Sequence, residues 1–393
     1  MLIHEIQLTN LLSFGPDTMS LKLRDLNIFI GPNGSGKSNL IEAISLLQAS
    51  PTDIAVPIRE GGGITDWLWK GKENPIATIE ADVNNTHKPD MPLRHAIELT
   101  QSAQRFAITD EQIENTRPYE KHEQPYFYYH FQNNHPVFNV RDTDGNGSQP
   151  RILKPEEVDP QQSILSQRKD PDQYPEITYL GRQYGKIRIY RDWQFGRYSP
   201  PRLPQKTDQL SIFLENDFKN LGLVLNRLRR KPEIKEQLLD RIRDLFPDIK
   251  DVDVSIEGGT VQVFLTEGKL SIPATRLSDG TLHYLCLLVL LLDPGDSPLI
   301  CIEEPELGLH PDILTGLAEL LKDASQKTQL IVTTHSEILV DALTDSPEDV
   351  VVCEKHNNRT TMERLDKTKL EVWLKKYRLG ELWRDGEIGG NRW

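Results

Sequence analysis

The sequence predicts an α/β fold with a mostly parallel sheet. An apolar run at 26–30 ends in a glycine-rich motif at 31–38, which a helix pattern follows. Strand and helix patterns alternate again through the last third of the chain, as is typical of parallel strands joined by crossover helices. Between these regions, from about 109 to 203, polar residues and prolines replace aliphatic runs. This change of composition predicts an inserted arm.

The N-terminal part alternates strand and helix signals. Residues 2–8 alternate apolar and polar side chains, which predicts a half-buried strand. Residues 37–48 place their apolar side chains on one helical face. Further strands are expected at 75–83 and 95–100. In the inserted arm, the aromatic run at 126–131 and an alternating run ending at Tyr190 predict a separate sheet, because a structureless loop of this length is uncommon.

Helical spacing returns near residue 210. Apolar residues recur every three or four positions from Leu214 to Leu228, which predicts one helix there, and a second is expected at 232–245. Two alternating runs joined at Gly258-Gly259 predict a hairpin. The remaining expected elements are helices at 278–292, 311–324 and 367–376 and strands at 299–302, 330–334 and 350–352.

Composition excludes several classes of protein. The chain has 393 residues and a formal net charge of −13, which argues against a protein that coats nucleic acid non-specifically. Its longest apolar run, 284–292, is well short of the roughly 20 residues of a membrane-spanning helix, and the N-terminus lacks the features of a signal peptide. Cys286, Cys301 and Cys353 lie in apolar stretches, so we expect buried thiols and a reducing, cytoplasmic compartment.

The glycine-rich motif Gly31-Pro-Asn-Gly-Ser-Gly-Lys-Ser38 matches G-x-x-x-x-G-K-[ST] at every fixed position. Backbone N–H groups of such a loop and the N-terminus of the next helix bind phosphate groups. Lys37 is expected to reach the β- and γ-phosphates of a nucleotide, and the Ser38 hydroxyl to bind Mg²⁺. A glycine turn that only starts a helix is the alternative. The expected nucleotide-binding residues of the loop are Asn33, Gly34, Ser35, Gly36, Lys37, Ser38 and Asn39.

The buried strand at 299–302 leads into two adjacent carboxylates, Glu303 and Glu304. Neighbouring side chains on a strand point to opposite faces, so one carboxylate can face a metal while the other reaches a water molecule. We therefore assign Glu303 to the metal shell and Glu304 as the general base or water-orienting group. A solvated acidic loop is the alternative interpretation.

Two further motifs lie at the ends of expected elements. The run R-L-S-D-G at 276–280 precedes an apolar helix, and Ser278 is a good N-cap residue, which would be a sufficient structural role. A serine and a glycine at a helix N-terminus also suit an anion. His335 follows the strand at 330–334. A lone histidine there is usually a polar strand end, but the order of the motifs favours a contact with the γ-phosphate.

The order of these motifs resembles that of the ABC-type ATPase heads of the SMC, RecF and OLD families. More narrowly, the run E-E-P-E-L-G-L-H-P at 303–311 and the tail at 386–393 resemble stand-alone AAA-type ATPases of bacteria without a Toprim domain. The resemblance implies an ABC-type P-loop ATPase head with a helical lobe and an inserted arm subdomain. The expected division is a P-loop lobe at 1–110, the arm at 111–205, and a part at 206–393 that holds the helical lobe, the remaining motifs and the tail.

The resemblance also implies an ATP site shared by two subunits. Gln194 is the candidate for the glutamine that joins Ser38 and Glu303 at the metal and couples the two lobes. Glu303 departs from the family pattern, where aspartate is commoner, and the signature reads Ser-Asp-Gly instead of Ser-Gly-Gly. The residues expected to act across the dimer are Ser278, Asp279 and Gly280 of the signature and Glu306, Gly308 and His310 of the D-loop, with His335 as the switch histidine.

A basic and aromatic stretch at 181–202 is a candidate for nucleic-acid contact. Arg188, Arg191 and Arg197 are interleaved with aromatic side chains, and such mixtures grip a phosphate backbone and stack on bases. An ordinary strand with one charged and one packed face is the alternative. The basic cluster at 227–231 ends a helix, where cations complement the helix dipole.

The motifs predict an ATPase that binds ATP and Mg²⁺, and the resemblance implies that it does so in a head-to-tail homodimer. By resemblance, its role is the sensor or switch of a DNA-repair or anti-phage defence system. About 58 residues follow His335, too few for a Toprim nuclease, so the effector is expected on a separate chain. An ATP-dependent regulatory binding module with little turnover is the alternative. A transporter subunit is disfavoured by the long insertion and the tail.

Overall fold

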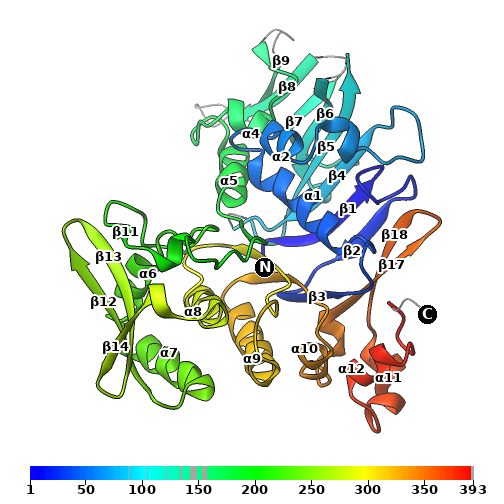
Figure 1. The fold of residues 1–393 in the computed structure, drawn as a ribbon. Coiled ribbons are helices and arrows are strands. Elements are labelled where there is room, and N and C mark those ends of the chain that lie inside the picture. The colour runs from blue at the N-terminus through cyan, green and yellow to red at the C-terminus, as the bar shows by residue number, and fades with distance from the viewer. Residues whose placement is uncertain are drawn as a thin grey trace. The chain divides into compact units, whose positions relative to one another are not determined.

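The computed structural model describes residues 1–86, 88–103, 105–120, 122–132, 135–141, 148–152 and 157–390 (Figure 1). The chain divides into two compact units, each assembled from three segments. The first comprises Met1–Arg24, Gly31–Ile187 and Val352–Glu363, and the second comprises Asp25–Ile30, Arg188–Val351 and Arg364–Trp393. The last three residues of the tail used for the resemblance, 391–393, lie outside the described residues.

The first unit is built on an eight-stranded sheet with the order β2-β1-β4-β5-β6-β7-β8-β9. Every neighbouring pair in this sheet is antiparallel. Its helices α1 and α5 contact each other, and α5 also contacts β7. The strands are β1 (Ile3–Thr9), β2 (Met19–Lys22), β4 (Ala77–Val83), β5 (Leu93–Ser102), β6 (Arg105–Asn115), β7 (Phe127–Gln132), β8 (His135–Arg141) and β9 (Ser148–Ile152). The helices are α1 (Lys37–Ala49), α2 (Ala55–Glu60), α3 (Ile64–Trp67), α4 (Ile164–Gln167) and α5 (Pro175–Tyr184).

The arm does not form a separate sheet, so that prediction is wrong. β6 runs across the expected boundary between residues 110 and 111, and its outer edge pairs with β7, where Ile113 faces Tyr129. An open strand edge exposes unpaired N–H and C=O groups, and the added antiparallel strands satisfy them. The three-part division of the chain stays a prediction.

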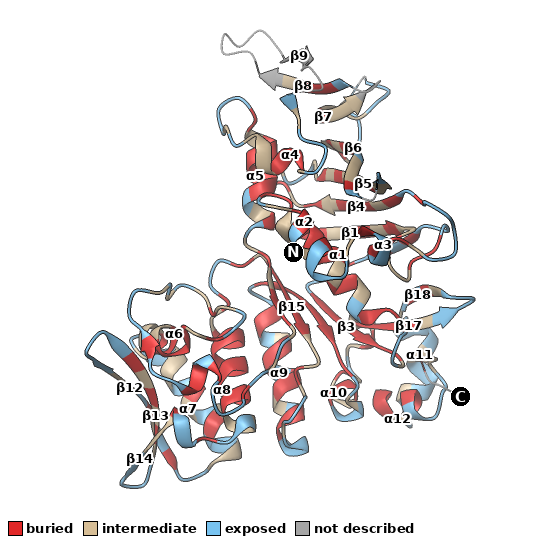
Figure 2. Ribbon diagram, turned by 45° about the horizontal axis from the view of Figure 1, so that its top comes forward, coloured by how far each residue is buried: buried red, intermediate tan, exposed pale blue. Residues whose placement is uncertain are grey.

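The second sheet has the order β10-β15-β16-β3-β17-β18. The pairs β10/β15, β15/β16 and β16/β3 are parallel, which confirms the predicted fold class. Every residue of β3 and β16 is buried, and Figure 2 shows the same for most of β15 and for much of α8 and α9. The strands are β3 (Leu26–Ile30), β10 (Arg188–Tyr190), β15 (Leu299–Glu303), β16 (Gln329–Thr333), β17 (Val350–His356) and β18 (Arg359–Arg364); β17 begins in the second unit and continues in the first.

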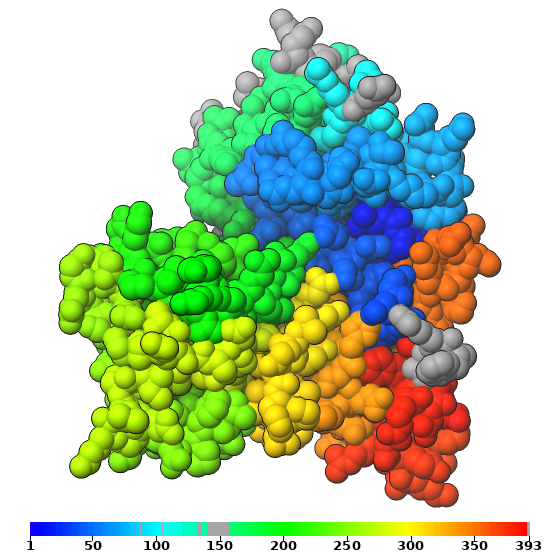
Figure 3. All heavy atoms as spheres, in the orientation of Figure 1, coloured from blue at the N-terminus to red at the C-terminus, as the bar shows by residue number. Residues whose placement is uncertain are grey.

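The second unit also carries a four-stranded sheet and most of the helices. The sheet has the order β11-β13-β12, with β14 on β13, and includes the expected hairpin. Helix α12 packs against α10, and in Figure 3 the red C-terminal residues lie at the surface beside the orange ones. The strands are β11 (Gln205–Lys206), β12 (Ile249–Glu257), β13 (Thr260–Glu267) and β14 (Leu270–Pro273), and the helices are α6 (Leu221–Leu228), α7 (Pro232–Leu245), α8 (Asp279–Leu292), α9 (Leu314–Ser325), α10 (Glu337–Asp341), α11 (Lys367–Leu374) and α12 (Leu379–Arg384).

The helix expected from Leu214 to Leu228 begins only at Leu221. The preceding residues form turns because Phe218 has a φ of 60°, which a right-handed helix does not allow. The amide group of Asn220 supports these turns, since it accepts a hydrogen bond from the Glu215 N–H and donates to the Leu210 and Phe213 carbonyl oxygens. Leu214 and Phe218 are buried without being helical.

The cysteines behave as the sequence predicts. Cys286, Cys301 and Cys353 are free and buried. Burial raises the pKa of the Cys301 and Cys353 thiols to about 12, so these two groups are protonated at neutral pH. Within the described ranges, every helix is too short or too polar to cross a membrane.

Candidate nucleotide-binding site

The glycine-rich loop joins the end of β3 to the start of α1 in a shape that needs glycine at two positions. Gly31 has a φ of 144°, and a Cβ atom there would lie 2.2 Å from the Cys353 carbonyl oxygen. Gly36 has a φ of 100°, and its Cβ atom would lie 2.2 Å from the Thr360 hydroxyl oxygen. Both positions combine the left-handed region with a close approach, so larger residues would distort the loop.

The polar groups of the loop fit the phosphates of a nucleotide. Lys37 is 6 % exposed, and its Nζ donates to the carbonyl oxygens of Gly31 (2.8 Å) and Pro32 (3.2 Å). The Ser35 hydroxyl oxygen is buried and has no hydrogen-bond partner among the described residues. A buried cation and an unpaired hydroxyl beside open space at Gly34 suit an anionic ligand. Ser38 and Asn33 are exposed.

Two hydroxyl side chains that the sequence did not single out, Ser13 and Thr360, support the glycine-rich loop. The Thr360 hydroxyl lies within hydrogen-bonding distance of the Ser13 hydroxyl (2.6 Å) and of the Ser35 carbonyl oxygen (2.9 Å). Asn39, expected to bind nucleotide, donates from its Nδ2 to the same Ser13 hydroxyl (2.6 Å). Ser13 and Thr360 come from distant parts of the chain and match no motif, so no local pattern signals them.

In the second unit, three parallel strands end at one edge of the sheet. Phe29 of β3 is paired with Thr333 of β16, and Thr333 is paired with Glu303 of β15. The glycine-rich loop is joined by a peptide bond to the end of β3, at Ile30. In open parallel sheets, ligands bind at this carboxyl edge.

Glu304 and His335 lie together at this edge, as their positions after neighbouring strands predict. The Glu304 Oε1 atom is 3.5 Å from the His335 Nε2 atom, and both side chains are about one-third exposed. Glu304 has a φ of 47°, and its N–H donates to the Thr333 carbonyl oxygen (3.0 Å). A glutamate in the left-handed region costs of order 1 kcal/mol or more, and such residues cluster at functional sites.

Glu306 links the D-loop segment to the strand end that carries His335. Its Oε1 atom accepts hydrogen bonds from the Thr334 hydroxyl (2.8 Å) and the His335 N–H (2.6 Å). Its Oε2 atom is buried without a hydrogen-bond partner among the described residues. Burial raises the pKa of the Glu306 carboxyl, and these hydrogen bonds only partly offset it.

The signature and D-loop segments touch at two glycines. A Cβ atom on Gly280 would lie 2.9 Å from the Gly308 carbonyl oxygen. Ser278 is the N-cap of α8, and its Oγ accepts from the Thr281 N–H (3.1 Å), so it has the structural role that the sequence left open. Ser278 and Asp279 are exposed, as is His310, which caps the turn at Pro311–Ile313. The proposed phosphate contacts of these residues stay a prediction.

Arg202 holds the signature segment, although the sequence placed it only in the basic stretch. Its guanidinium is buried and donates to the carbonyl oxygens of Phe195 (3.0 Å), Ala274 (3.3 Å) and Leu277. It also forms an ion pair with Asp279. An arginine presents its donors in a fixed plane, so these bonds set the position of the residues just before α8.

Trp193 and His283 connect the carboxylate strand to the D-loop. The Trp193 indole N–H donates to the Glu303 carbonyl oxygen (2.6 Å), and its ring lies 4.2 Å from that of His283. The His283 Nδ1–H donates to the Leu307 carbonyl oxygen (2.8 Å). Burial lowers the pKa of His283 to about 4, so its ring is neutral at pH 7. Gln194 is exposed and follows Trp193 directly, which leaves its metal role a prediction.

The three arginines proposed for nucleic acid have different surroundings. Arg188 belongs to the edge strand β10, and its guanidinium lies 3.8 Å from the centre of the Phe213 ring. Burial lowers the pKa of Arg188. Arg191 is half-buried, while Arg197 is exposed and lies over the Tyr198 ring. Nucleic-acid contact at these residues stays a prediction.

Comparison with known proteins gives a family and a fold. A family model described as "AAA domain, putative AbiEii toxin, Type IV TA system" matches residues 26–341. A search of curated proteins found no match.

Solved structures of SMC heads match nearly the whole chain. An SMC head bound to the C-winged helix domain of ScpA has a TM-score of 0.55 and 16 % identity, covering 93 % of this chain and 99 % of that one. An SMC head with an extended coiled coil, bound to the C-terminal domain of ScpA derived from Pyrococcus furiosus, has a TM-score of 0.57 and 13 % identity over 95 % and 98 %. A third, derived from Pyrococcus yayanosii, has a TM-score of 0.50 and 11 % identity over 95 % and 99 %. At these identities the matches show the fold, which is that of an SMC-type head.

Proposed function

Since the chain belongs to this AAA-domain family and has the fold of an SMC-type ATPase head, we propose that it binds ATP and hydrolyses it as a head-to-tail homodimer. The observation that carries the proposal is the arrangement of Glu304, His335 and Glu306 at the carboxyl edge of the parallel sheet. A glutamate held in a strained conformation beside a histidine is suited to orient and deprotonate a water molecule.

The loop residues bind and orient the nucleotide in this proposal. Lys37, whose Nζ donates to the Gly31 and Pro32 carbonyl oxygens, would bind the β- and γ-phosphates, and Ser38, Glu303 and Gln194 would be the residues that hold Mg²⁺. Mg²⁺, when bound, neutralises charge on the phosphate oxygens. Glu304 takes the proton of the attacking water, and His335 contacts the γ-phosphate while it stays close to Glu304.

The dimer supplies the groups that one subunit lacks. Ser278, Asp279 and His310 are exposed, and the D-loop residue Leu307 is 51 % exposed. In the proposed dimer, Ser278 and Gly280 of one protomer face the nucleotide bound by the other. The contact between Gly280 and Gly308 and the bond from His283 to Leu307 let the signature and D-loop move together.

The biological role in this proposal is that of an ATP-driven switch in a defence or repair system. The family description, which names an abortive-infection toxin and a toxin–antitoxin system, supports the defence role. The effector, a nuclease or another enzyme, is supplied on a separate chain in this proposal, and contact with DNA is a further input to the switch.

Phosphate release by the purified chain with Mg²⁺ and ATP tests the enzymatic part. The intact chain is expected to release phosphate, and Glu304→Gln to bind ATP normally while turnover falls at least about 10²-fold, the lower end of what a general base contributes. Glu267→Gln, which changes a residue of β13, is the matched control and should leave turnover unchanged. Equal slow turnover in all three proteins would favour a regulatory binding module instead.

A further inference from the structure

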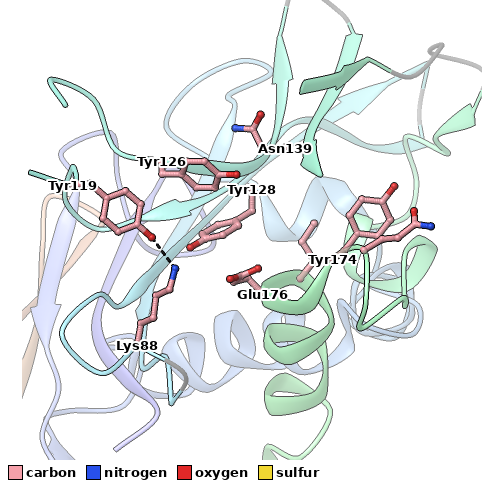
Figure 4. Close-up of a pocket in the computed structure, with 9 residues that line it drawn as sticks. Lys88, Tyr119, Tyr126, Tyr128, Asn139, Tyr174 and Glu176 are labelled. Atoms are coloured by element: carbon pink, nitrogen blue, oxygen red, sulfur yellow. Dashed lines mark hydrogen bonds between the residues drawn. The ribbon is translucent and has the colours of Figure 1, made fainter. Parts of the chain in front are cut away.

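The first unit has a pocket of about 370 Å³ between β7, β8 and the first turn of α5 (Figure 4). Lys88 Nζ donates to the Tyr119 hydroxyl (2.9 Å), and the Tyr128 hydroxyl donates to the Asn115 Oδ1 atom (2.9 Å). Both polar groups are therefore already bonded to neighbouring side chains, so neither selects a ligand. In the second unit, by contrast, the packing of the C-terminal segment leads directly to His335.

The short helix α10 begins two residues after His335, so its position determines where that histidine lies. A helix of five residues is not stable by itself, because the cost of forming its first turn outweighs its few hydrogen bonds. Leu339 and Val340 of α10 are buried, and α12 packs against this helix (Figure 1). The position of α10 therefore depends on its neighbours.

Gly380 lets α12 approach α10 closely. Its N–H donates to the Asp341 Oδ1 atom (2.7 Å), and the N–H of Leu379 donates to the Thr344 hydroxyl oxygen (3.1 Å). A Cβ atom on Gly380 would lie 2.5 Å from the Glu337 carbonyl oxygen and 2.6 Å from the Asp341 Oδ1 atom. Glycine is unfavourable within a helix, and the close approach to α10 is the reason for it here.

Hydrogen bonds connect the start of α10 to the candidate site. Ser336 is the N-cap of α10, where its Oγ accepts from the Leu339 N–H (3.2 Å), and its own N–H donates to the Thr334 hydroxyl oxygen (3.0 Å). The Thr334 hydroxyl donates in turn to Glu306 (2.8 Å), the carboxylate that also accepts from the His335 N–H (2.6 Å). His335 is therefore held between Glu306 and α10, and a shift of α10 would move it.

We propose that Gly380 is a positioning residue for His335. By letting α12 dock on α10, it keeps the histidine where its side chain reaches the γ-phosphate. This role rests on the proposed function, in which His335 contacts that phosphate. The glycine-rich tail supports the docked helix, since the Trp383 indole N–H donates to the Gly390 carbonyl oxygen (3.2 Å).

Nucleotide binding to Gly380→Ala tests this role without any need for turnover. The added methyl group would meet the Glu337 carbonyl oxygen, so α12 and α10 must separate. With Mg²⁺, affinity for the analogue AMP-PNP should fall about tenfold, the lower end of what a hydrogen bond to a charged group contributes. Affinity for ADP, which lacks the γ-phosphate, should stay unchanged. Hydrogen exchange of the backbone amides at 335–341 should speed up.

Three further variants separate positioning from general damage. Gly316→Ala, the matched control, changes a helical glycine of α9 whose Cβ atom would lie 3.6 Å from the Arg241 Nη1 atom, an ordinary contact, so nucleotide affinity should not change. Asp341→Asn keeps an oxygen acceptor for the Gly380 N–H and should bind AMP-PNP like the intact protein, while Asp341→Ala should bind it more weakly.

Two results would overturn the role of Gly380 and leave the proposed ATPase in place. One is equal affinity of Gly380→Ala and Gly316→Ala for AMP-PNP, and the other is an equal loss of affinity for AMP-PNP and ADP in Gly380→Ala. An intact protein that binds neither nucleotide would instead overturn the proposed function, and this role with it.

Discussion

Replacing Arg202 by alanine should release the signature segment from the rest of the second unit. The guanidinium donates to the carbonyl oxygens of Phe195, Ala274 and Leu277, and all three lose a charged donor. A hydrogen bond to a charged group contributes about 1.5–3 kcal/mol. The bond to Ala274 is the longest, at 3.3 Å, so we expect a total loss of about 3–5 kcal/mol. Asp279 is 69 % exposed, and its ion pair adds at most about 1 kcal/mol.

Hydrogen exchange of the backbone amides at 277–282 measures this loss locally. Exchange there should speed up by roughly 10²- to 4 × 10³-fold, because each 1.4 kcal/mol corresponds to a factor of ten. Arg202→Lys keeps the charge but loses the planar guanidinium, so its exchange rates should lie between those of the intact protein and those of Arg202→Ala. Arg197→Ala removes an exposed arginine nearby and is the control. If exchange in Arg202→Ala matched that in Arg197→Ala, the assigned role of Arg202 would be refuted.

Three further predictions follow from the site. Lys37→Ala should lower ATP affinity by at least tenfold in a binding assay, while Lys22→Ala, on an exposed strand position, should not. Trp193→Phe keeps the ring stack but leaves the Glu303 carbonyl oxygen without its indole donor, so turnover should fall while the melting temperature changes little; unchanged turnover would contradict the link. The pKa of His283 is lowered to about 4 by burial, so the unfolded chain binds one proton more than the folded chain between about pH 6.5 and pH 4. The free energy of unfolding should therefore decrease by up to about 3 kcal/mol as the pH is lowered through this window. Urea unfolding of His283→Gln should show a smaller decrease over the same window. Parallel curves for the two proteins would exclude His283 as the cause.

Local patterns predict the shape of short segments, and the glycine-rich loop and the strand ends of the candidate site are such segments. The glycine-rich loop follows a buried strand, and its shape depends on Gly31 and Gly36 themselves. The closeness of Glu304 and His335 follows from a general rule, since parallel strands end at the same edge of their sheet. The buried state of the cysteines follows from their apolar neighbours in the same way.

Long-range pairing accounts for what the sequence did not show. The arm strands join the first sheet because the outer edge of β6 is open, and nothing in their composition distinguishes this from a separate sheet. Arg202 lies in a basic stretch, and its role depends on carbonyl oxygens more than seventy positions away. The short α6 depends on the bonds of Asn220, which override the apolar spacing before it.

The most direct test of the central claim is the oligomeric state of Glu304→Gln with Mg²⁺ and ATP, measured by sedimentation. We expect a stable dimer with ATP, a monomer without it, and loss of the dimer when Ser278→Arg places a bulky cation at the exposed signature. Phosphate release from the trapped dimer should be at least about 10²-fold slower than from the intact protein. A Glu304→Gln protein that stays monomeric with saturating ATP, or a dimer that forms equally well with Ser278→Arg, would contradict the shared ATP site.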